Sequence, residues 1–126
     1  MTKSHTRKVL VVEDNELNMR LFCDLLDAFG FETFQCRDGA KAVEIARQEL
    51  PDLIIMDIQL PHVSGLDLIA QMKSDAQLSA VPVLAVTAYA GKGDEDRIRA
   101  AGAEDYLAKP VSIGPFSTKV IGLIGE

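Results

Sequence analysis

The sequence predicts an α/β domain in which five parallel strands alternate with five helices. Short apolar runs alternate with longer amphipathic segments five times along the 126 residues, and no linker rich in Ser, Gly or Pro interrupts them. Three of the short runs are almost entirely apolar, which is typical of strands buried on both faces of a parallel sheet. The length and the hydrophobic content of 48% suit one domain with one good core.

The strands are expected at the short apolar runs. In chain order, we expect them at 9–12, 32–36, 53–56, 83–86 and 106–108. A chain of five such strand-helix units most often folds as a flavodoxin-like, doubly wound sandwich. Its parallel strands lie in the order 2-1-3-4-5, and its ligand crevice lies at the carboxyl ends of strands 1 and 3.

The helices are expected in the gaps between these strands, where amphipathic patterns of roughly ten to fourteen residues are long enough to cross between parallel strands. Gly30 follows the first helix, where a left-handed residue commonly ends one, and Pro51 closes the second. Ser64 with Asp67 resembles a capping box at the start of the third. In the last helix, Pro115 is least strained in the first turn.

Charge and composition exclude several classes of protein. The net charge is −6 and the basic residues are dispersed, so nucleic acid is not expected as a partner. Only four unbroken apolar residues follow the basic start of the chain, which predicts neither a signal peptide nor a membrane insertion. We therefore expect a cytoplasmic protein, with residues 1–7 disordered or loosely held and 8–126 forming a single domain without an output domain.

Polar side chains follow four of the predicted strands where each strand ends. Glu13 and Asp14 follow the first strand, Asp57 the third, Thr87 the fourth and Lys109 the fifth. Because the carboxyl ends of parallel strands meet at one edge of the sheet, three carboxylates should share a crevice with a hydroxyl and an ammonium group. Taken one at a time, these residues also suit a helix N-terminus, a turn, a strand end and the surface.

Three carboxylates in one crevice need a compensating cation. At about 4 Å and an effective dielectric constant near 20, each pair repels by about 4 kcal/mol. The absence of Cys and His from this set favours Mg²⁺ over softer metals, with coordination positions left for a phosphoryl group. Asp57 suits a carboxylate nucleophile for that group, Glu13 and Asp14 suit the metal, and Thr87 and Lys109 suit the phosphoryl oxygens.

Four segments around these strand ends resemble those of a known family. They are VLVVEDNELNMRL, PDLIIMDIQLPHVSGLDL, PVLAVTAYAGKGDEDRI and DYLAKP. Together they resemble the receiver domain of bacterial two-component response regulators, over about residues 8–124. Within that family, NELNM, MDIQLP, VTAYA and KGDEDRIR are most similar to a single-domain regulator of cell division and polarity. EDNELNM and MDIQLP also look like receivers fused to hybrid histidine kinases, so a fragment of such a kinase is an alternative.

The resemblance implies a role for each site residue. Asp57 would accept the phosphoryl group, and the carboxylates of Glu13, Asp14 and Asp57 would bind Mg²⁺ together with the backbone carbonyl of Gln59. Thr87 would be the switch hydroxyl that is drawn to the phosphoryl group. Lys109 would pair with that group and precede a cis peptide bond to Pro110, and Tyr106 would turn inward after Thr87 moves.

The partners implied are proteins. A phosphohistidine on a histidine kinase or phosphotransfer protein would supply the phosphoryl group. Output would be binding to a downstream protein target, and such partners would recruit the chain to a cell pole. On the first helix, a core-facing arc comprises Met19, Phe22, Cys23, Leu25, Leu26 and Phe29. Leu17, Leu21 and Ala28 form a separate strip, which either docks the donor or is covered by a neighbouring helix.

Three rival functions are open at this stage. A phosphotransferase of the haloacid dehalogenase type also uses an aspartyl nucleophile and Mg²⁺, but it normally needs a second acid where Gln59 stands. A flavodoxin-like cofactor protein would place phosphate after the first strand, where Glu13 and Asp14 would repel it. A scaffold that keeps the fold without switching is disfavoured by the intact set of acids, Thr87 and Lys109.

Overall fold

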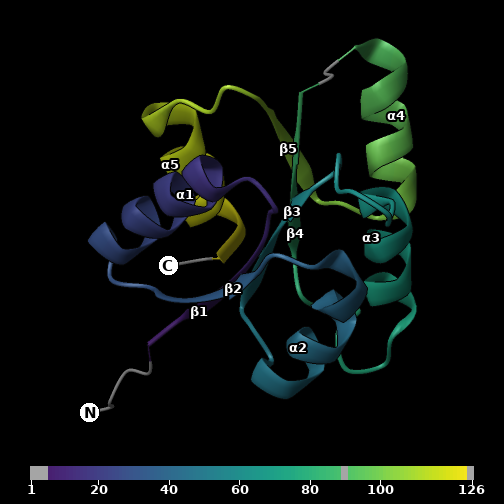
Figure 1. Ribbon diagram of the computed structural model, residues 1–126, viewed down its shortest axis with the longest axis horizontal. Coiled ribbons are helices and arrows are strands. Elements are labelled where there is room, and N and C mark those ends of the chain that lie inside the picture. The colour runs from purple at the N-terminus through teal and green to yellow at the C-terminus, as the bar shows by residue number, and fades with distance from the viewer. Residues whose placement is uncertain (1–5, 89–90, 125–126) are drawn as a thin grey trace.

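Five parallel strands form the centre of the molecule in the order β2-β1-β3-β4-β5, as the sequence predicts (Figure 1). The computed structural model describes residues 6–88 and 91–124. Asp57 and Thr87 continue the ladder, opposite Val86 and Ala108, so β3 and β4 each extend one residue beyond their last apolar residue. The strands are β1 (Lys8–Val12), β2 (Glu32–Cys36), β3 (Leu53–Asp57), β4 (Val83–Thr87) and β5 (Asp105–Ala108).

The helices cover both faces of this sheet. On one face lie α1 and α5, and on the other lie α2, α3 and α4 (Figure 1). The sheet separates two buried clusters, and on the α1 and α5 side the rings of Phe22 and Phe116 stack at 5.5 Å. The helices are α1 (Glu16–Ala28), α2 (Ala42–Glu49), α3 (Gly65–Ser74), α4 (Lys92–Ala101) and α5 (Ile113–Ile124), with a short 3₁₀ helix at Gly39–Lys41 before α2.

The helix ends follow the sequence signals. The Ser64 side chain accepts a hydrogen bond from the backbone N–H of Asp67 and caps α3. Beyond α1, Gly30 has a φ of 89°, and beyond α2 the left-handed residue is Leu50, directly before Pro51. Pro115 occupies the first turn of α5, where its missing N–H has no helical partner to lose.

Gly65 is required by a close approach of backbone segments. A Cβ atom at this position would lie 2.5 Å from the Asp57 carbonyl oxygen and 2.7 Å from Ile58 Cα. The start of α3 therefore packs directly on the backbone that follows β3, and only glycine allows this spacing. This contact fixes the backbone that carries Asp57.

The first described residues are held against the sheet. The Arg7 guanidinium donates a hydrogen bond to the Ile124 carbonyl, and the Arg7 carbonyl accepts one from Glu32 N–H. The prediction that residues 1–7 are loosely held otherwise falls on 1–5, which lie outside the described residues. In the described part of the chain, no helix is long and apolar enough to cross a membrane.

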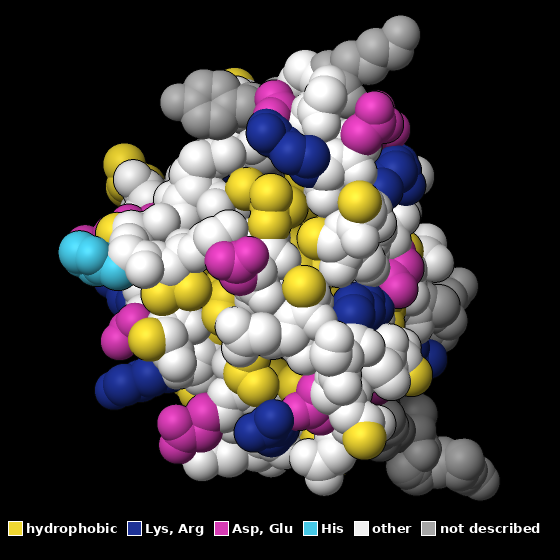
Figure 2. All heavy atoms as spheres, turned by 90° about the vertical axis from the view of Figure 1, so that its right-hand side faces the viewer, with side chains coloured by type: hydrophobic (Ala, Val, Ile, Leu, Met, Phe, Trp, Pro, Cys, Tyr) yellow, Lys and Arg dark blue, Asp and Glu magenta, His cyan; other side chains and the backbone are white. Residues whose placement is uncertain are grey.

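The surface over α2, α3 and α4 mixes charges of both signs. Figure 2 shows this face, where Lys and Arg side chains lie beside Asp and Glu, and hydrophobic side chains form small separate areas. Because no charge of one sign dominates the view, this face does not have the basic patch that nucleic-acid binding requires.

Candidate functional site

Four strand ends bring the predicted polar residues to one edge of the sheet. Glu13 follows β1, Asp57 ends β3, Thr87 ends β4 and Lys109 follows β5. The side chains of Glu13, Asp57 and Thr87 are buried, at 0%, 2% and 1% exposure, whereas Asp14 is exposed. The buried polar groups therefore lie beside an exposed carboxylate, Asp14, which is the side from which a ligand can reach them from solvent.

The three carboxylates lie within reach of one cation. One oxygen each from Glu13, Asp14 and Asp57 lies within 4.8 Å of the others. The Lys109 ammonium group lies 3.4 Å from Glu13 Oε1 and 3.3 Å from Asp57 Oδ2, so a single positive charge faces two buried acids. A hard divalent cation with oxygen ligands suits the remaining charge.

Glu13 is the acid of this cluster whose ionised form is disfavoured by its surroundings. Burial, together with the neighbouring Asp57, raises the pKa of its carboxyl group to about 7. Its Oε2 accepts a hydrogen bond from Asn15 N–H, whereas its Oε1 makes no hydrogen bond and faces the Lys109 ammonium group at 3.4 Å. This single distant cation leaves room for a metal ion as a closer partner, and the oxygen-only donor set fits Mg²⁺.

The backbone after β3 holds the Asp57 carboxylate. The N–H of Gln59 donates to Asp57 Oδ1 at 2.9 Å, while Lys109 faces the other oxygen. The close contact of Gly65 with the Asp57 carbonyl fixes the same segment from the α3 side. Asp57 is therefore presented in one orientation at the base of the crevice. The peptide bond between Lys109 and Pro110 is cis, as the resemblance implies.

The Gln59 side chain contacts β4, which the sequence did not indicate. Its Nε2 donates to Thr87 Oγ1 at 2.8 Å, and its Oε1 accepts from Ala88 N–H at 2.8 Å. Sequence reasoning assigned only the Gln59 backbone carbonyl to the site. The contacts join residues 28 and 29 positions apart, and nothing in the local pattern around Gln59 signals them.

Tyr106 lies against α4. Its hydroxyl donates to Glu95 Oε1 at 3.1 Å, and the Arg99 guanidinium stands 5.6 Å from the ring centre. The hydrogen bond to Glu95 raises the pKa of the Tyr106 hydroxyl. Arg99 in turn bonds to Glu95 at 3.1 Å, so these three side chains form one linked group between α4 and β5.

The apolar strip on α1 is exposed. Leu17 is 76% exposed, Leu21 is 37% exposed and Ala28 is also exposed, so in this structure no neighbouring helix covers the three. Met19, Phe22, Cys23 and Leu26 are buried as expected, and Leu25 is partly buried. The prediction for Phe29 is wrong: it is the C-cap of α1, stays 36% exposed and packs edge-on against Phe31.

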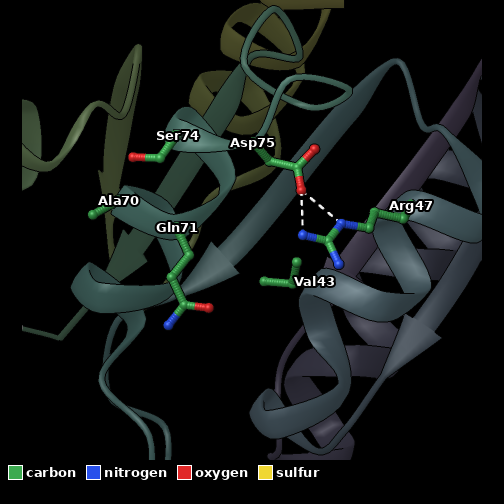
Figure 3. Close-up of a pocket in the computed structure, with 6 residues that line it drawn as sticks. All are labelled: Val43, Arg47, Ala70, Gln71, Ser74 and Asp75. Atoms are coloured by element: carbon green, nitrogen blue, oxygen red, sulfur yellow. Dashed lines mark hydrogen bonds and ion pairs between the residues drawn. The ribbon is translucent and has the colours of Figure 1, made fainter.

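The structure also has a hollow away from these candidate site residues. It has a volume of about 400 Å³ and lies between α2 and α3, where Arg47 and Asp75 face each other across it (Figure 3). Arg47 Nε donates to Asp75 at 2.6 Å, so the two charges that border the hollow satisfy one another. The candidate site residues and this hollow are therefore on different parts of the molecule.

The chain is similar to a known family and to solved structures. The family model for the response regulator receiver domain matches residues 9–120. The polar-differentiation response regulator DivK of Brucella ovis is 51% identical over 121 residues, which cover 96% of this chain and 98% of that protein. This match confirms the resemblance, predicted from the sequence segments, to a single-domain regulator of cell division and polarity.

Two solved structures illustrate the likeness in fold. A putative response regulator from Chloroflexus aurantiacus has a TM-score of 0.91 at 25% identity and covers 97% of this chain and 100% of that one. The receiver domain of the sensor histidine kinase PA1611 from Pseudomonas aeruginosa has a TM-score of 0.88 at 31% identity, with the same coverage. That structure has a magnesium ion coordinated in its active site cleft.

Proposed function

This chain belongs to the response regulator receiver domain family, and on that premise we propose that Asp57 is the residue through which it receives a phosphoryl group. It is a phosphorylation-switched signalling protein related to DivK. The observation that carries the assignment to Asp57 is its place at the base of the crevice, 2% exposed, with Lys109 on one oxygen and the Gln59 N–H on the other.

The reaction is a transfer between two side chains. A carboxylate oxygen of Asp57 attacks the phosphorus of a phosphohistidine in line with the P–N bond. The new O–P bond gives an acyl phosphate, and the imidazole nitrogen leaves with the electron pair of the broken bond. Lys109 pairs with a phosphoryl oxygen and Thr87 donates its hydroxyl to another. The chain would catalyse only this transfer and the slow hydrolysis of the acyl phosphate, in which water attacks the phosphorus and the Asp57 carboxylate leaves with inorganic phosphate as the other product.

Mg²⁺ is the proposed cofactor. The carboxylates of Glu13, Asp14 and Asp57 and the backbone carbonyl of Gln59 would hold it, which is supported by the oxygen-only donor set and by Glu13 Oε1, which makes no hydrogen bond. When bound, the ion offsets the negative charge that gathers on the transferring oxygens. The magnesium ion in the PA1611 receiver structure is in keeping with this proposal.

The proposed partners are a phosphorylated donor and a downstream protein. Leu17, Leu21 and Ala28 offer an exposed apolar strip on α1, beside the crevice, for a helix of a histidine kinase or phosphotransfer protein. Binding of Thr87 to the phosphoryl group would release Tyr106 to turn inward and alter the surface of α4, β5 and α5. By its likeness to DivK, the chain would act in the cytoplasm and gather at a cell pole through its partners.

The rival reading as a phosphotransferase of the haloacid dehalogenase type has less support. That chemistry needs a second acid two positions after the nucleophile, and here the Gln59 amide stands there and bonds to Thr87 and Ala88. Sustained hydrolysis of a small phosphate ester would revive the enzyme reading. A single turnover that stops at one phosphoryl group per chain agrees with a switch.

The central test compares wild type with Asp57→Asn. With Mg²⁺ and a small phosphodonor such as phosphoramidate, intact-mass spectrometry should show one added phosphoryl group on wild type and none on Asp57→Asn. Asp96→Asn is the matched control, because Asp96 is exposed on α4, and it should label like wild type. Labelling of Asp57→Asn at the wild-type rate would refute the assignment.

A further inference from the structure

Gln59 contacts both Asp57, at the end of β3, and the residues at the end of β4. Its backbone N–H holds Asp57 Oδ1 at 2.9 Å, while its carboxamide reaches across to the end of β4. There the carboxamide donates to Thr87 Oγ1 and accepts from Ala88 N–H, both at 2.8 Å. A single residue thus contacts the candidate phosphoacceptor, the last residue of β4 and the residue that follows it.

Both of these β4-end residues carry a donor that a phosphoryl group on Asp57 could use, the Thr87 O–H and the Ala88 N–H. The Thr87 hydroxyl and the Ala88 N–H are adjacent in sequence and both turn toward the β3 side of the crevice, as their bonds to Gln59 show. A phosphoryl group has three strong acceptor oxygens and binds hydroxyl and N–H donors. The carboxamide oxygen of Gln59 satisfies Ala88 in the same way that a phosphoryl oxygen would.

An empty space lies next to the Gln59 carboxamide. A hollow of about 80 Å³ adjoins Gln59 and Thr87 on the side of α4, and Leu66 and Ile98 contribute to its wall. This space is larger than the about 30 Å³ that one water takes up in the liquid. The end of the Gln59 side chain can therefore turn toward it when it leaves Ala88.

From these contacts we propose that Gln59 is a positioning residue whose carboxamide oxygen occupies the Ala88 N–H in the resting chain and must be displaced from it by the phosphoryl group. Its carboxamide N–H meanwhile donates to Thr87 Oγ1 and so holds the side chain of Thr87 in its resting position. The inference rests on the proposed function of Asp57. Phosphorylation then replaces the bond from Ala88 to Gln59 with a bond from Ala88 to a phosphoryl oxygen. Gln59 holds the β4 end in its resting position and opposes premature switching.

The test uses beryllofluoride, a phosphoryl mimic, with the full chain and saturating Mg²⁺. Gln59→Met keeps the length of the side chain but removes both hydrogen bonds, and Gln59→Ala removes the side chain beyond Cβ. Beryllofluoride should bind both variants about tenfold more tightly than wild type, because the net value of one or two hydrogen bonds no longer opposes it. Gln71→Met, the same change on the exposed face of α3, should bind like wild type.

A second readout reports the contact itself. In backbone NMR without beryllofluoride, the Ala88 amide should shift upfield and exchange faster with solvent in Gln59→Met, because it has lost its acceptor. Mg²⁺ affinity is measured in parallel. A change in beryllofluoride affinity that merely followed a change in Mg²⁺ affinity would overturn the proposal, as would an unchanged Ala88 amide.

The outcomes separate this inference from the proposed function. If wild type binds beryllofluoride and Gln59→Met binds it equally or more weakly, Asp57 remains the acceptor and the competition by Gln59 is refuted. If wild type fails to bind beryllofluoride with Mg²⁺ present, the assignment of Asp57 fails and the inference fails with it. Tighter binding by both variants, with Gln71→Met unchanged, supports the competition.

Discussion

Glu13 combines complete burial with a carboxyl group whose ionisation is opposed by its surroundings. Burial is the main cause of its raised pKa, and Asp57 adds to it, while Lys109 acts in the opposite direction. Its proton is therefore bound more tightly in the folded chain than in the unfolded chain. The stability that this proton provides is complete below about pH 4.5 and is lost as the pH rises through about 7.

We therefore expect the free energy of unfolding in Mg²⁺-free buffer to fall by up to about 3 kcal/mol between pH 5 and pH 8. Urea denaturation at several pH values measures this slope. Glu13→Gln should flatten it, since an amide does not titrate. Added Mg²⁺ should stabilise wild type more at pH 8 than at pH 5, because the ion binds the ionised form. A slope that is the same in both proteins would contradict the assignment.

At this scale, the strand-end rule predicted which polar residues lie together at the edge of the sheet, and it missed one contact. Glu13, Asp57, Thr87 and Lys109 could be predicted because each directly follows or ends a strand, and parallel strands bring those ends together. The side-chain contacts of Gln59 could not be predicted, because they depend on a rotamer that reaches another strand. The pattern of apolar residues predicts the helices and strands and their order in the sheet. It does not predict which side chains of neighbouring strands are in contact.

Among the elements, α4 and β5 are joined by side chains rather than by backbone. Glu95 accepts from the Tyr106 hydroxyl, and Arg99 contacts Glu95, the Tyr106 ring and Asp105. Asp105 in turn pairs with Lys119 of α5 at 2.9 Å. This chain of contacts holds Tyr106 against α4 and makes its position sensitive to one acidic residue.

Replacing Glu95 by Gln should lower the pKa of Tyr106 toward its ordinary value. The hydrogen bond to the Glu95 carboxylate is the largest cause of the raised pKa, and a neutral amide no longer disfavours the tyrosinate. Carbon-13 NMR of labelled tyrosine, assigned with Tyr106→Phe, measures the change. Glu44→Gln on the exposed face of α2 is the control, and an equal shift in that variant would exclude a local effect.

The exposed strip on α1 allows the proposed binding of the donor protein to be tested separately from the phosphorylation of Asp57. Leu17→Asp places a charge on a side chain that is 76% exposed, so the fold should tolerate it. Transfer from a phosphorylated donor protein should slow by about tenfold or more, since an apolar contact at an interface is lost. Labelling by a small phosphodonor should remain at the wild-type rate. Equal loss with both donors would point to misfolding instead.

Helix boundaries were predicted more reliably than burial at helix ends. Gly30 and Pro51 marked the ends of α1 and α2 because their backbone preferences are local properties. Phe29 was expected in the core by extending the helical period one residue too far. Phe29 is the C-cap, directly before the left-handed Gly30, and its ring contacts Phe31 at the surface.

For the whole molecule, the order of strands and the alternation with helices followed from the sequence, because buried parallel strands leave long apolar runs. The division of the interior into two clusters follows from that order. Leu10, Ile54 and Ala85 belong to the cluster under α2, α3 and α4, and Val11, Ile55 and Leu84 to the cluster under α1 and α5. Successive residues of one strand thus pack into different buried clusters.

The two halves should respond unequally to the phosphoryl mimic. Tyr106 packs against the cluster under α2, α3 and α4, and α4 carries Glu95 and Arg99. With Mg²⁺ and beryllofluoride, hydrogen-deuterium exchange should change most in β4, α4 and β5, and least in the buried part of α1 around Phe22. Asp57→Asn should show neither change. Exchange that changed mainly in α1 would contradict this division.

The same division has a consequence for how such proteins diversify. The exposed strip on α1 lies outside both buried clusters, and it lies on the opposite face of the sheet from α4. Mutations on that strip can therefore accumulate without disturbing the packing around Tyr106, and mutations on α4 can do so without disturbing α1. A duplicated gene could acquire a new kinase while keeping its old target, or the reverse. Insulated signalling pathways could then arise from one ancestral chain by a few surface substitutions.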